Sequence, residues 1–426
     1  MTKRLTVFLL ALTVAIGILV IPASAASTIT LRIFDNIPDR NSPWGTVIDT
    51  INKEFMRQHG NVKIVVESLP DQPYQEKMKV YAASNRMPDV FKYWSFATLL
   101  GELVNNKLAM PLNKKDYTKF NFVPGSLESN IYNGKLYGLP VTMDYWVVYY
   151  NKALFEKCNV KVPRTIEDLI AAAKVFRANG IMPVSTDGKD AWALCLTWDN
   201  LTGRVGGDFT VIKKAIDRKM KYTDPVFLTS AKKFKEMVDA GVFQDDLLTD
   251  DYDAAKNLFG QEKAAMYIMG AWEMGLGTNM AFSEHFRKNV GVFKFPVLRD
   301  GKGKVDDLLA WYGGNYVVNA KTKYKTLCLQ YLQLYFKMYP TLIWKTKANV
   351  PAQKIKPLAD DSQLAKDLLA IVADAKQTSG TGGLDLSTPE FKELHQKYIQ
   401  DLAAGVKSPE EFCKALDEAA AKAAQK

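Results

Sequence analysis

Strand and helix periodicities alternate from residue 29 onward, and this alternation constrains the fold more than any other feature of the sequence. Ile29, Leu31 and Ile33 alternate with polar residues, as on a half-buried strand, and the next apolar residues recur at helical spacing until Gly60. The alternation then continues with a strand pattern at 62–67, a helix pattern at 74–83 and a short strand pattern at 89–91. It predicts an α/β fold with a mostly parallel sheet that helices cover on both faces.

Later helices begin at recognisable capping residues. Thr165, with Asp168 three residues on, predicts the start of a helix over 166–178, and Ser408 opens a capping box before a proline at the first helical position. Thr388 precedes another such proline. The sequence has no internal repeat and no low-complexity linker, which favours two lobes joined by several strands over separate domains on a tether.

The first 26 residues have the pattern of a signal peptide. Lys3 and Arg4 precede an almost wholly apolar run, and small residues follow it, so cleavage is expected after Ala25 or Ala26. An uncleaved membrane anchor is the alternative. The first cysteine is Cys158, so a lipoprotein anchor at the mature N-terminus is excluded. These features predict an exported, soluble protein of the periplasm.

Length and charge limit the further possibilities. A chain of 426 residues is larger than one hydrophobic core usually serves, so two lobes are expected. The formal net charge is +10, but the basic residues are scattered among acidic ones rather than forming a stripe. The charge is therefore interpreted as solvated surface, with no nucleic-acid partner, although it permits an anionic ligand.

Motifs for catalysis, metals or cofactors are absent from the sequence. It contains no Gly-x-Ser-x-Gly, no His-Glu-x-x-His and no phosphate-binding P-loop, and its three histidines are isolated and expected at the surface. The acidic cluster at 245–253 lacks the glycine and distal glutamate of a calcium loop and is interpreted as solvated. No catalytic residue, metal ligand or cofactor is assigned. The four cysteines, Cys158, Cys195, Cys328 and Cys413, lack a Cys-x-x-Cys spacing and are expected to be buried thiols with at most one disulfide.

Four segments, in order, resemble a known family. They are Asn85-Arg86-Met87-Pro88-Asp89-Val90, the stretch from Asn133-Gly134-Lys135-Leu136-Tyr137-Gly138-Leu139-Pro140 to Asn151 with Lys152-Ala153-Leu154-Phe155-Glu156 and Pro163-Arg164-Thr165 after it, the stretch 259–273, and Gly313-Gly314-Asn315-Tyr316-Val317-Val318-Asn319. They resemble extracellular solute-binding proteins of family 1, the sugar-binding, maltose-binding-protein-like receptors of ABC transporters. One departure is Gln261-Glu262-Lys263, where the family more often has a glycine before the lysine.

The resemblance implies the two-lobed periplasmic binding protein fold of type II, with three chain crossings and the ligand cleft between the lobes. With the crossings placed on the matched segments, residues 27–143 plus 269–313 are assigned to the N-terminal lobe. Residues 144–268 plus 314–426 are assigned to the C-terminal lobe. The resemblance also implies a monomer that closes around its ligand by a hinge motion and is then recognised by the transmembrane permease subunits of an ABC importer.

Candidate ligand-binding residues lie where strands end and where the chain crosses between lobes. Sugars present paired hydroxyls, which carboxylates and amides bind, and a weakly apolar ring face, which tryptophan and tyrosine cover. Ligands bind beyond the carboxyl ends of strands in such sheets. The candidates are Asn36, Arg40, Tyr93, Trp94, Asp144, Trp146, Trp192, Trp272, Glu273, Trp311, Tyr312 and Gly313.

Several of these candidates have structural alternatives. Asp144 falls where the family usually has a cleft carboxylate, but a strand-end cap or a salt bridge would also explain it. Trp146 competes with Tyr145, because neighbouring residues of a strand face opposite sides. Gly313 and Gly314 indicate either a close approach to ligand or a simple bulge. Trp198 and Trp344, away from the crossings, are expected in the core.

The sequence therefore predicts a periplasmic substrate-binding component that captures a mono- or oligosaccharide without catalysing a reaction. An anionic solute such as a uronate oligomer is the alternative within the same class. A secreted carbohydrate-active enzyme is the alternative from another class, because two carboxylates at the correct separation suffice for glycoside hydrolysis.

Overall fold

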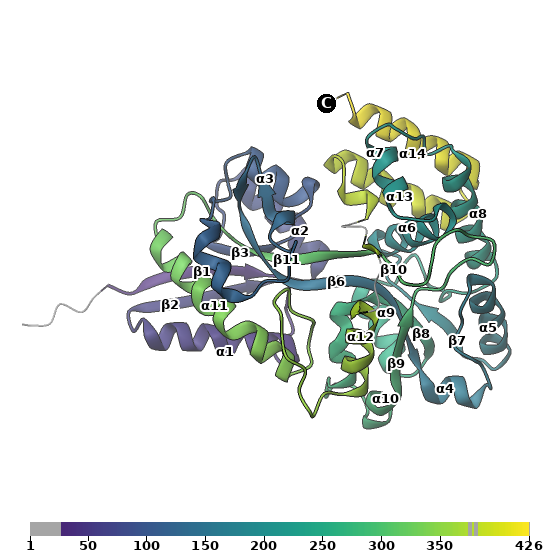
Figure 1. Cartoon of the computed structure of the whole chain (residues 1–426), viewed down its shortest axis with the longest axis horizontal. Helices are drawn as coiled ribbons and strands as arrows, with labels where there is room; N and C mark the ends of the chain where they lie inside the picture. Colours follow the sequence, from purple (N-terminus) through teal and green to yellow (C-terminus); the bar gives the residue numbers. More distant parts are fainter. Residues whose placement is uncertain (1–26, 374–376, 379–381, 426) are drawn as a thin grey trace, which may run out of the picture.

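The computed structural model describes residues 27–373, 377–378 and 382–425. The expected signal peptide lies outside these residues. Within them, two lobes stand side by side and are joined by strands that run from one to the other (Figure 1). No helix of this described part is long and apolar enough to cross a membrane.

A mixed sheet runs through both lobes in the order β2-β1-β3-β11-β6-β8-β7, and β9 also pairs with β6. Its strands are β1 (Ile29–Asp35), β2 (Val62–Ser68), β3 (Val90–Tyr93), β6 (Gly138–Asn151), β7 (Met182–Ser185), β8 (Ala264–Gly270), β9 (Val290–Lys294) and β11 (Ala310–Val318). Two small sheets pair β4 (Ile131–Tyr132) with β5 (Lys135–Leu136) and β10 (Asp307–Leu308) with β12 (Gln377–Thr378). The parallel pairs β1–β2, β1–β3 and β7–β8 confirm the predicted α/β class.

Helices cover the sheet in both lobes. The N-terminal lobe carries α1 (Pro43–Gln58), α2 (Asp71–Ala83), α3 (Glu102–Asn105) and α11 (Lys325–Lys345), with the short turns η1 (Ala97–Gly101), η2 (Lys114–Phe120) and η3 (Glu128–Asn130). The C-terminal lobe carries α4 (Lys152–Lys157), α5 (Ile166–Ala178), α6 (Trp192–Gly206), α7 (Thr210–Ile216), α8 (Pro225–Asp239), α9 (Tyr252–Gly260), α10 (Glu284–Asn289), α12 (Gln363–Ala373), α13 (Pro389–Ala403) and α14 (Pro409–Ala423), with η4 (Ala271–Gly277) and η5 (Gly383–Asp385).

The predicted helix starts are confirmed. Thr165 and Asp168 form a capping box at α5, and Ser408 and Glu411 form another at α14. At the start of α13, the Thr388 side chain accepts a hydrogen bond from the backbone N–H of Phe391. Each cap satisfies backbone donors that have no partner within their helix.

Strand β6 belongs to both lobes. Its first part, Gly138 to Tyr145, pairs with β11, and its last part, Trp146 to Asn151, pairs with β8 and β9. The turn before it uses Asn133 and Gly134, both with positive φ, as a tight hairpin between β4 and β5 requires. The strand therefore carries the chain from one hydrophobic core into the next.

The packing corrects the predicted division into lobes. Residues 269–309, assigned to the N-terminal lobe, pack in the C-terminal core, because β8 and β9 pair with the last part of β6. Most of residues 316–348, assigned to the C-terminal lobe, pack in the N-terminal core, where α11 lies against α1, although Trp344 packs in the C-terminal core. The chain thus stays in the C-terminal lobe from β6 until β11 brings it back, and it re-enters that lobe before α12.

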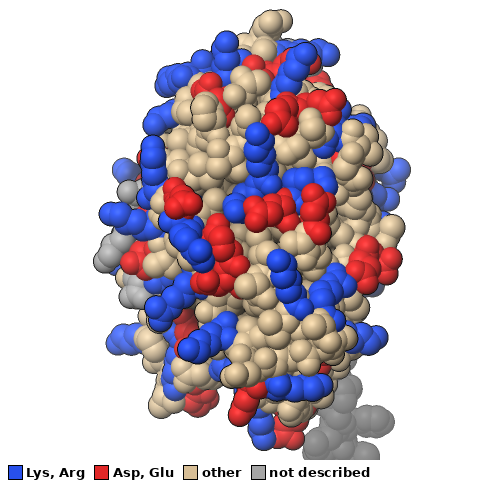
Figure 2. Space-filling model, turned by 90° about the vertical axis from the view of Figure 1, so that its right-hand side faces the viewer, with Lys and Arg blue, Asp and Glu red and all other residues tan. Residues whose placement is uncertain are grey.

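The surface charge, the cysteines and the histidines can each be compared with what the sequence predicts. On the outer face of the C-terminal lobe, basic and acidic side chains are interspersed without a continuous basic patch (Figure 2). All four cysteines are free thiols. The expectation of surface histidines is wrong for His395, which is fully buried on α13 against Trp198 and Phe412. Burial lowers the pKa of His395 to about 3, so the ring is neutral near pH 7.

Candidate functional site

A cleft of about 800 Å³ lies between the two lobes. The N-terminal lobe contributes the residues that follow β1 and β3 and the first turns of α1 and α2. The C-terminal lobe contributes the first turns of α6 and α9, the η4 turn and one side of α13. Strands β6 and β11, which cross between the lobes, form its floor.

Seven of the predicted residues line this cleft: Asn36, Trp94, Asp144, Trp192, Trp272, Glu273 and Trp311. They come from separate stretches of chain, which the two crossings β6 and β11 bring to one place. The structure therefore assembles the residues at strand ends and crossings into one site.

Three other predicted residues lie outside the lining because protein partners surround them. The guanidinium of Arg40 pairs with the carboxylates of Asp35, at 2.9 Å, and Asp49. Tyr93 is 4% exposed within the N-terminal core. The hydroxyl of Tyr312 donates a hydrogen bond to the carbonyl of Pro124 at 3.3 Å.

Neither Trp146 nor its neighbour Tyr145 lines the cleft. Trp146 is 1% exposed and lies directly behind Trp192 and Trp272, with ring centroids 5.9 and 6.0 Å away. Trp146 thus supports two lining rings without reaching the cleft itself. Gly313 is likewise absent from the lining, whereas Gly314 is part of it.

The aromatic wall, defined as Trp192, Tyr252, Trp272 and Trp311, forms the C-terminal side of the cleft. The ring centroids of Trp192 and Trp272 lie 6.1 Å apart, and those of Trp272 and Trp311 lie 6.0 Å apart. Tyr252 stacks on Trp192 with centroids 6.3 Å apart. Such rings pack against one another and present faces that cover an apolar ligand surface.

Glu273 holds this wall together. Its carboxylate accepts a hydrogen bond from the Tyr252 hydroxyl and pairs with the Lys256 ammonium at 2.9 Å. The same Tyr252 oxygen accepts a hydrogen bond from the Trp272 indole at 3.1 Å. Glu273 was predicted to accept hydrogen bonds from ligand hydroxyls, but here protein donors already occupy it, so its geometry is that of a residue that positions Tyr252.

The polar wall, defined as Asn36, Trp44, Lys92 and Trp94, forms the N-terminal side. Lys92 is 4% exposed, and its ammonium donates a hydrogen bond to the Asn36 side-chain oxygen at 2.9 Å. The ammonium also lies 4.2 Å from the ring centroid of Trp44 and 5.9 Å from that of Trp94, within the range of cation–π contacts. Burial lowers the pKa of Lys92 to about 8, so it remains largely protonated at pH 7.

Asp144 lies at the floor, on β6. It is 5% exposed, its Oδ1 has no hydrogen-bond partner among the described residues, and burial raises its pKa to about 6. The indole nitrogen of Trp311, opposite Asp144 in the strand register, also has no partner there. The floor therefore holds a buried acceptor and a buried donor without a hydrogen-bond partner among the described residues, which is unusual in a protein interior.

Two glycines make room for the floor side chains. A Cβ at Gly313 would lie 1.7 Å from Asp144 Oδ2, and one at Gly314 would lie 2.4 Å from Lys92 Cε. Gly314 also has φ +55°, which favours glycine. Strands β6 and β11 keep one register on both sides of these glycines, so a close approach explains them better than a bulge does.

Several lining residues were missed by the sequence analysis. Trp44 sits in the first turn of α1 and Lys92 inside β3, and neither lies at a strand end or a crossing. Asp251 and Asp253, interpreted as solvated surface, line the cleft at the start of α9. Trp44 follows a proline at a helix start, but no local signal marks Lys92, Asp251 or Asp253 as lining the cleft.

Carboxylates outnumber ammonium groups in the lining. The acidic residues are Asp39, Asp71, Glu76, Asp144, Asp190, Asp251, Asp253, Glu273 and Asp385, and the basic ones are Lys92, Lys189, Lys256 and Lys392. The cleft is thus acidic in a chain whose formal net charge is +10. The described residues contain no group of three or more side chains arranged to hold a metal ion.

Direct contacts join the lobes at one rim of the cleft. Thr98 of the N-terminal lobe donates a hydrogen bond to Asp385 at 3.3 Å, and Lys392 bonds to Gln75 at 3.4 Å and to Asp385 at 2.9 Å. These contacts connect η1 and α2 with η5 and α13. The lobes therefore touch at this rim of the cleft.

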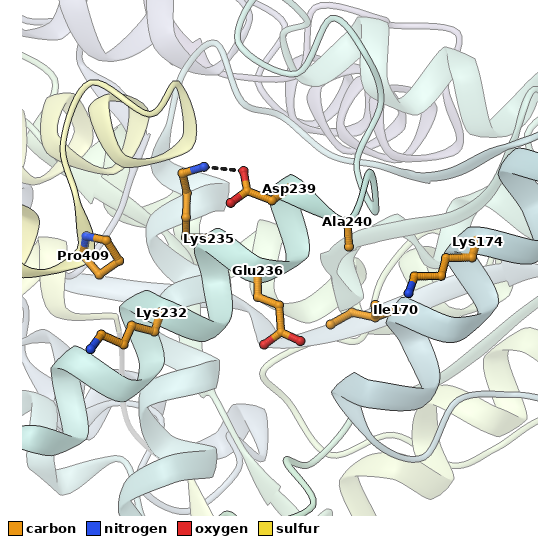
Figure 3. Close-up of a pocket in the computed structure, with 8 residues that line it drawn as sticks. All are labelled: Ile170, Lys174, Lys232, Lys235, Glu236, Asp239, Ala240 and Pro409. Atoms are coloured by element: carbon orange, nitrogen blue, oxygen red, sulfur yellow. Dashed lines mark hydrogen bonds and ion pairs between the residues drawn. The ribbon is translucent and has the colours of Figure 1, made fainter.

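A second hollow lies on the outer surface of the C-terminal lobe, between α5 and α8 (Figure 3). It is shallow and open, and most of its charged groups are paired: Lys235 with Asp239, Glu236 with Lys233 and Lys232 with Glu410, the last two pairs at 2.8 Å. Paired surface charges of this kind are common on solvated helices and contribute little to binding. The interlobe cleft is therefore the candidate site.

Comparisons with known proteins agree with this architecture. Residues 43–337 match the family model described as bacterial extracellular solute-binding protein. An uncharacterised ABC transporter extracellular-binding protein of Pyrococcus horikoshii is 28% identical over 55% of this chain and 56% of its own length. The multiple sugar-binding protein of Streptococcus mutans is 24% identical over 66% of this chain and 65% of its own length, so the chain spans less than two thirds of either relative.

A solved structure has the same fold over nearly its full length. It comes from a study of xylan utilisation by the thermophilic bacterium Caldanaerobius polysaccharolyticus. It is 28% identical to this chain, covers 92% of this chain and 99% of its own, and superimposes with a TM-score of 0.85. The two-lobed binding-protein fold predicted from the sequence is confirmed.

Proposed function

Because this chain belongs to the bacterial extracellular solute-binding protein family, we propose that it is the exported substrate-binding component of an ABC importer and captures a neutral carbohydrate. The observation that carries this proposal is the cleft with aromatic rings on one wall and hydrogen-bonding groups on the other wall and the floor. The face of a sugar ring packs on the aromatic rings, and the sugar hydroxyls form hydrogen bonds with the other wall and the floor. The names of the relatives, which include sugar binding and xylan utilisation, support the same class.

Capture proceeds by lobe closure. Ligand that touches both walls stabilises the closed arrangement, because it binds this arrangement better than an open one. The crossing strands β6 and β11 carry the hinge, since they are the elements shared by both lobes. The membrane permease then recognises the closed form.

The acidic lining favours a neutral ligand over a uronate oligomer. An anionic sugar would enter a cleft in which carboxylates already outnumber lysines, and three of the four lysines, Lys189, Lys256 and Lys392, pair with carboxylates. The net charge of +10, which permitted an anionic ligand, therefore resides outside the cleft. We further propose that the protein binds its sugar without turning it over, that it is a monomer and that its leader is cleaved.

A thermal-shift screen of the exported chain tests it. Neutral di- and oligosaccharides, uronates, amino acids and polyamines are compared, followed by calorimetry and product analysis for each stabilising compound. A ligand at 100 times its Kd adds about 2.7 kcal/mol to the free energy of unfolding. Stabilisation by a neutral sugar that is recovered intact supports the proposal, whereas stabilisation by uronates alone, or hydrolysis of the sugar, contradicts it.

A further inference from the structure

Two opposite charges are buried together at the floor of the cleft. Lys92 enters from β3 in the N-terminal lobe, and Asp144 enters from β6 at the crossing. Both side chains are at least nine-tenths buried, yet both line the cleft. Burying a charge is costly unless it is balanced, so this pair needs an explanation.

The protein itself keeps the two charges in place. Lys92 is held by Asn36 and by the ring of Trp44, and Gly314 leaves the space that its side chain occupies. The Asp144 carboxylate occupies the space that Gly313 leaves. We call this arrangement, Lys92 and Asp144 with Gly313 and Gly314 between them, the floor pair.

The floor pair still has free hydrogen-bonding capacity. Asp144 Oδ1 and the Trp311 indole nitrogen have no partner among the described residues, and the Lys92 ammonium has three hydrogens for the one side-chain acceptor that Asn36 supplies. The Trp311 nitrogen lies 3.2 Å from the position of a Cβ on Gly313, the same position that Asp144 Oδ2 approaches. The floor thus offers one acceptor and two donors. Two hydroxyls, each of which both donates and accepts, would satisfy them.

From this arrangement we propose that the floor pair reads two neighbouring hydroxyls of an uncharged sugar ring, and that Lys92 is the residue that sets this specificity together with Asp144. One hydroxyl donates to Asp144 and accepts from the Trp311 indole, and its neighbour accepts from Lys92. The inference rests on the proposed function and deepens it by naming the charge and substituents of the bound ring.

Charge balance decides the class of sugar at this position. The ammonium and the carboxylate offset each other, so the ring that they hold adds no charge. A carboxylate in place of the hydroxyl that Asp144 holds would meet a like charge, and so would an amine in place of the hydroxyl that Lys92 holds. A neutral ring avoids both repulsions. Removing either member of the pair leaves the other unbalanced and changes which analogue is preferred.

The test compares four proteins by calorimetry: the wild type, Lys92→Met, Asp144→Asn and the double variant. The neutral probes are xylobiose, cellobiose and lactose. Galacturonate and glucuronate disaccharides serve as anionic probes, and glucosamine and galactosamine disaccharides serve as cationic ones. Each single variant is expected to lose roughly tenfold or more in affinity for the neutral probe that the wild type binds, as for hydrogen bonds to charged groups.

A change in preference separates specificity from general damage to the fold. Asp144→Asn is expected to raise affinity for a uronate probe relative to the neutral probe, and Lys92→Met to raise relative affinity for an amine probe. The double variant is expected to lose less than the product of the single losses, because both residues act on one pair of hydroxyls. A misfolded protein would bind all probes less well and would show no such exchange.

Two matched variants control for position and for the added methyl group. Lys189→Met removes another cleft lysine, one whose side chain is half exposed and pairs with Asp251, so a much smaller loss is expected. Gly313→Ala is expected to displace Asp144 and weaken binding of the neutral probe. Gly60 lies outside the cleft lining and a Cβ there meets nothing within 4 Å, so Gly60→Ala is expected to lose far less.

The failures can be told apart. If no neutral probe binds the wild type, the proposed function fails and this inference fails with it. If the wild type binds a neutral probe and the folded single variants keep that affinity or leave the preference among probes unchanged, the inference alone is overturned. Loss of neutral binding with exchanged preference supports it.

Discussion

The two walls of the cleft are built from different chemistry. The aromatic wall of the C-terminal lobe consists of rings that pack against one another, backed by the buried Trp146. The polar wall of the N-terminal lobe centres on one buried ammonium, held by an amide and flanked by two indoles. Contacts within the aromatic wall are mostly apolar, and contacts within the polar wall are electrostatic.

This difference separates stability from recognition. Apolar packing contributes in proportion to the area removed from water and does not depend on the orientation of hydroxyls. Hydrogen bonds to buried charges depend strongly on which group is presented and leave a penalty when it is missing. The aromatic wall is therefore expected to supply affinity for many sugars, and the polar wall and floor to choose among them.

Trp146→Ala is expected to give the largest effect, on stability. Trp146 is 1% exposed behind the lining rings, so its truncation lowers the free energy of unfolding by about 3–5 kcal/mol. Urea unfolding followed by circular dichroism measures this change. Trp44→Ala, on the half-buried ring of the polar wall, is the control. Equal losses in the two variants would contradict the distinction between a packed wall and a polar one.

Trp272→Ala is expected to reduce affinity across neutral sugars by roughly 1–3 kcal/mol, because it removes a central ring of the aromatic wall. Calorimetry with several sugars checks whether the loss is uniform. Trp198→Phe, in the core of the C-terminal lobe and away from the cleft, serves as the comparison. A loss confined to one sugar would assign selectivity to the aromatic wall and so reverse the roles of the two walls.

Sugar affinity is expected to be highest between about pH 6 and pH 8, the values to which burial brings the pKa of Asp144 and of Lys92. Below this window Asp144 takes up a proton and loses its charge, and above it Lys92 releases one. Beyond either limit affinity falls by up to tenfold, or about 1.4 kcal/mol, per pH unit.

Calorimetric titrations at several pH values measure this profile. Half-buried Asp71, whose pKa burial also raises to about 6, lies in the same cleft, so variants are needed to assign the limbs. Asp144→Asn is expected to remove the acid limb and Lys92→Met the alkaline one. A flat profile in the wild type would show that the floor charges do not contact the sugar.

Thr98→Val is expected to have the smallest effect. It removes the hydrogen bond to Asp385 that joins the lobes, worth about 0.5–1.5 kcal/mol, and so favours the open arrangement. Small-angle scattering of the ligand-free protein and the apparent affinity report this shift. Thr118→Val, whose hydroxyl bonds within the N-terminal lobe, is the control. An unchanged scattering profile would mean that this rim contact does not influence closure.

The sequence predicted what depends on local pattern. Strand and helix periodicity identified β1, α1, β2, α2 and β3, and capping residues identified the starts of α5 and α14, because these signals act within a few residues. Residues at strand ends were also predictable. Trp311 lies on the crossing strand β11, and Trp272 lines the cleft although it follows β8, which does not cross between the lobes. The lobe boundaries were wrong, because strand pairing between distant segments decides to which core a segment belongs.

The rest of the site depends on the direction in which side chains point, which the sequence does not reveal. Trp146 lies at a crossing, yet other rings cover it, and no local pattern distinguishes a covered ring from a lining one. Lys92 occupies an ordinary position inside a short strand, and only the fold reveals that Asn36, Trp44 and Gly314 surround it. Buried charges that distant segments bring to one place are invisible to periodicity, and these are the residues that we expect to determine specificity.

Strand β6 connects the two lobes, so a rotation between the lobes bends or twists this strand. The floor residues Thr142 and Asp144 lie near the middle of this strand, where it passes from one lobe to the other. When one lobe rotates slightly relative to the other at this point, the displacement of the lobe surfaces grows with their distance from β6. A partner that contacts both outer ends would therefore sense whether the floor is occupied while remaining far from the ligand.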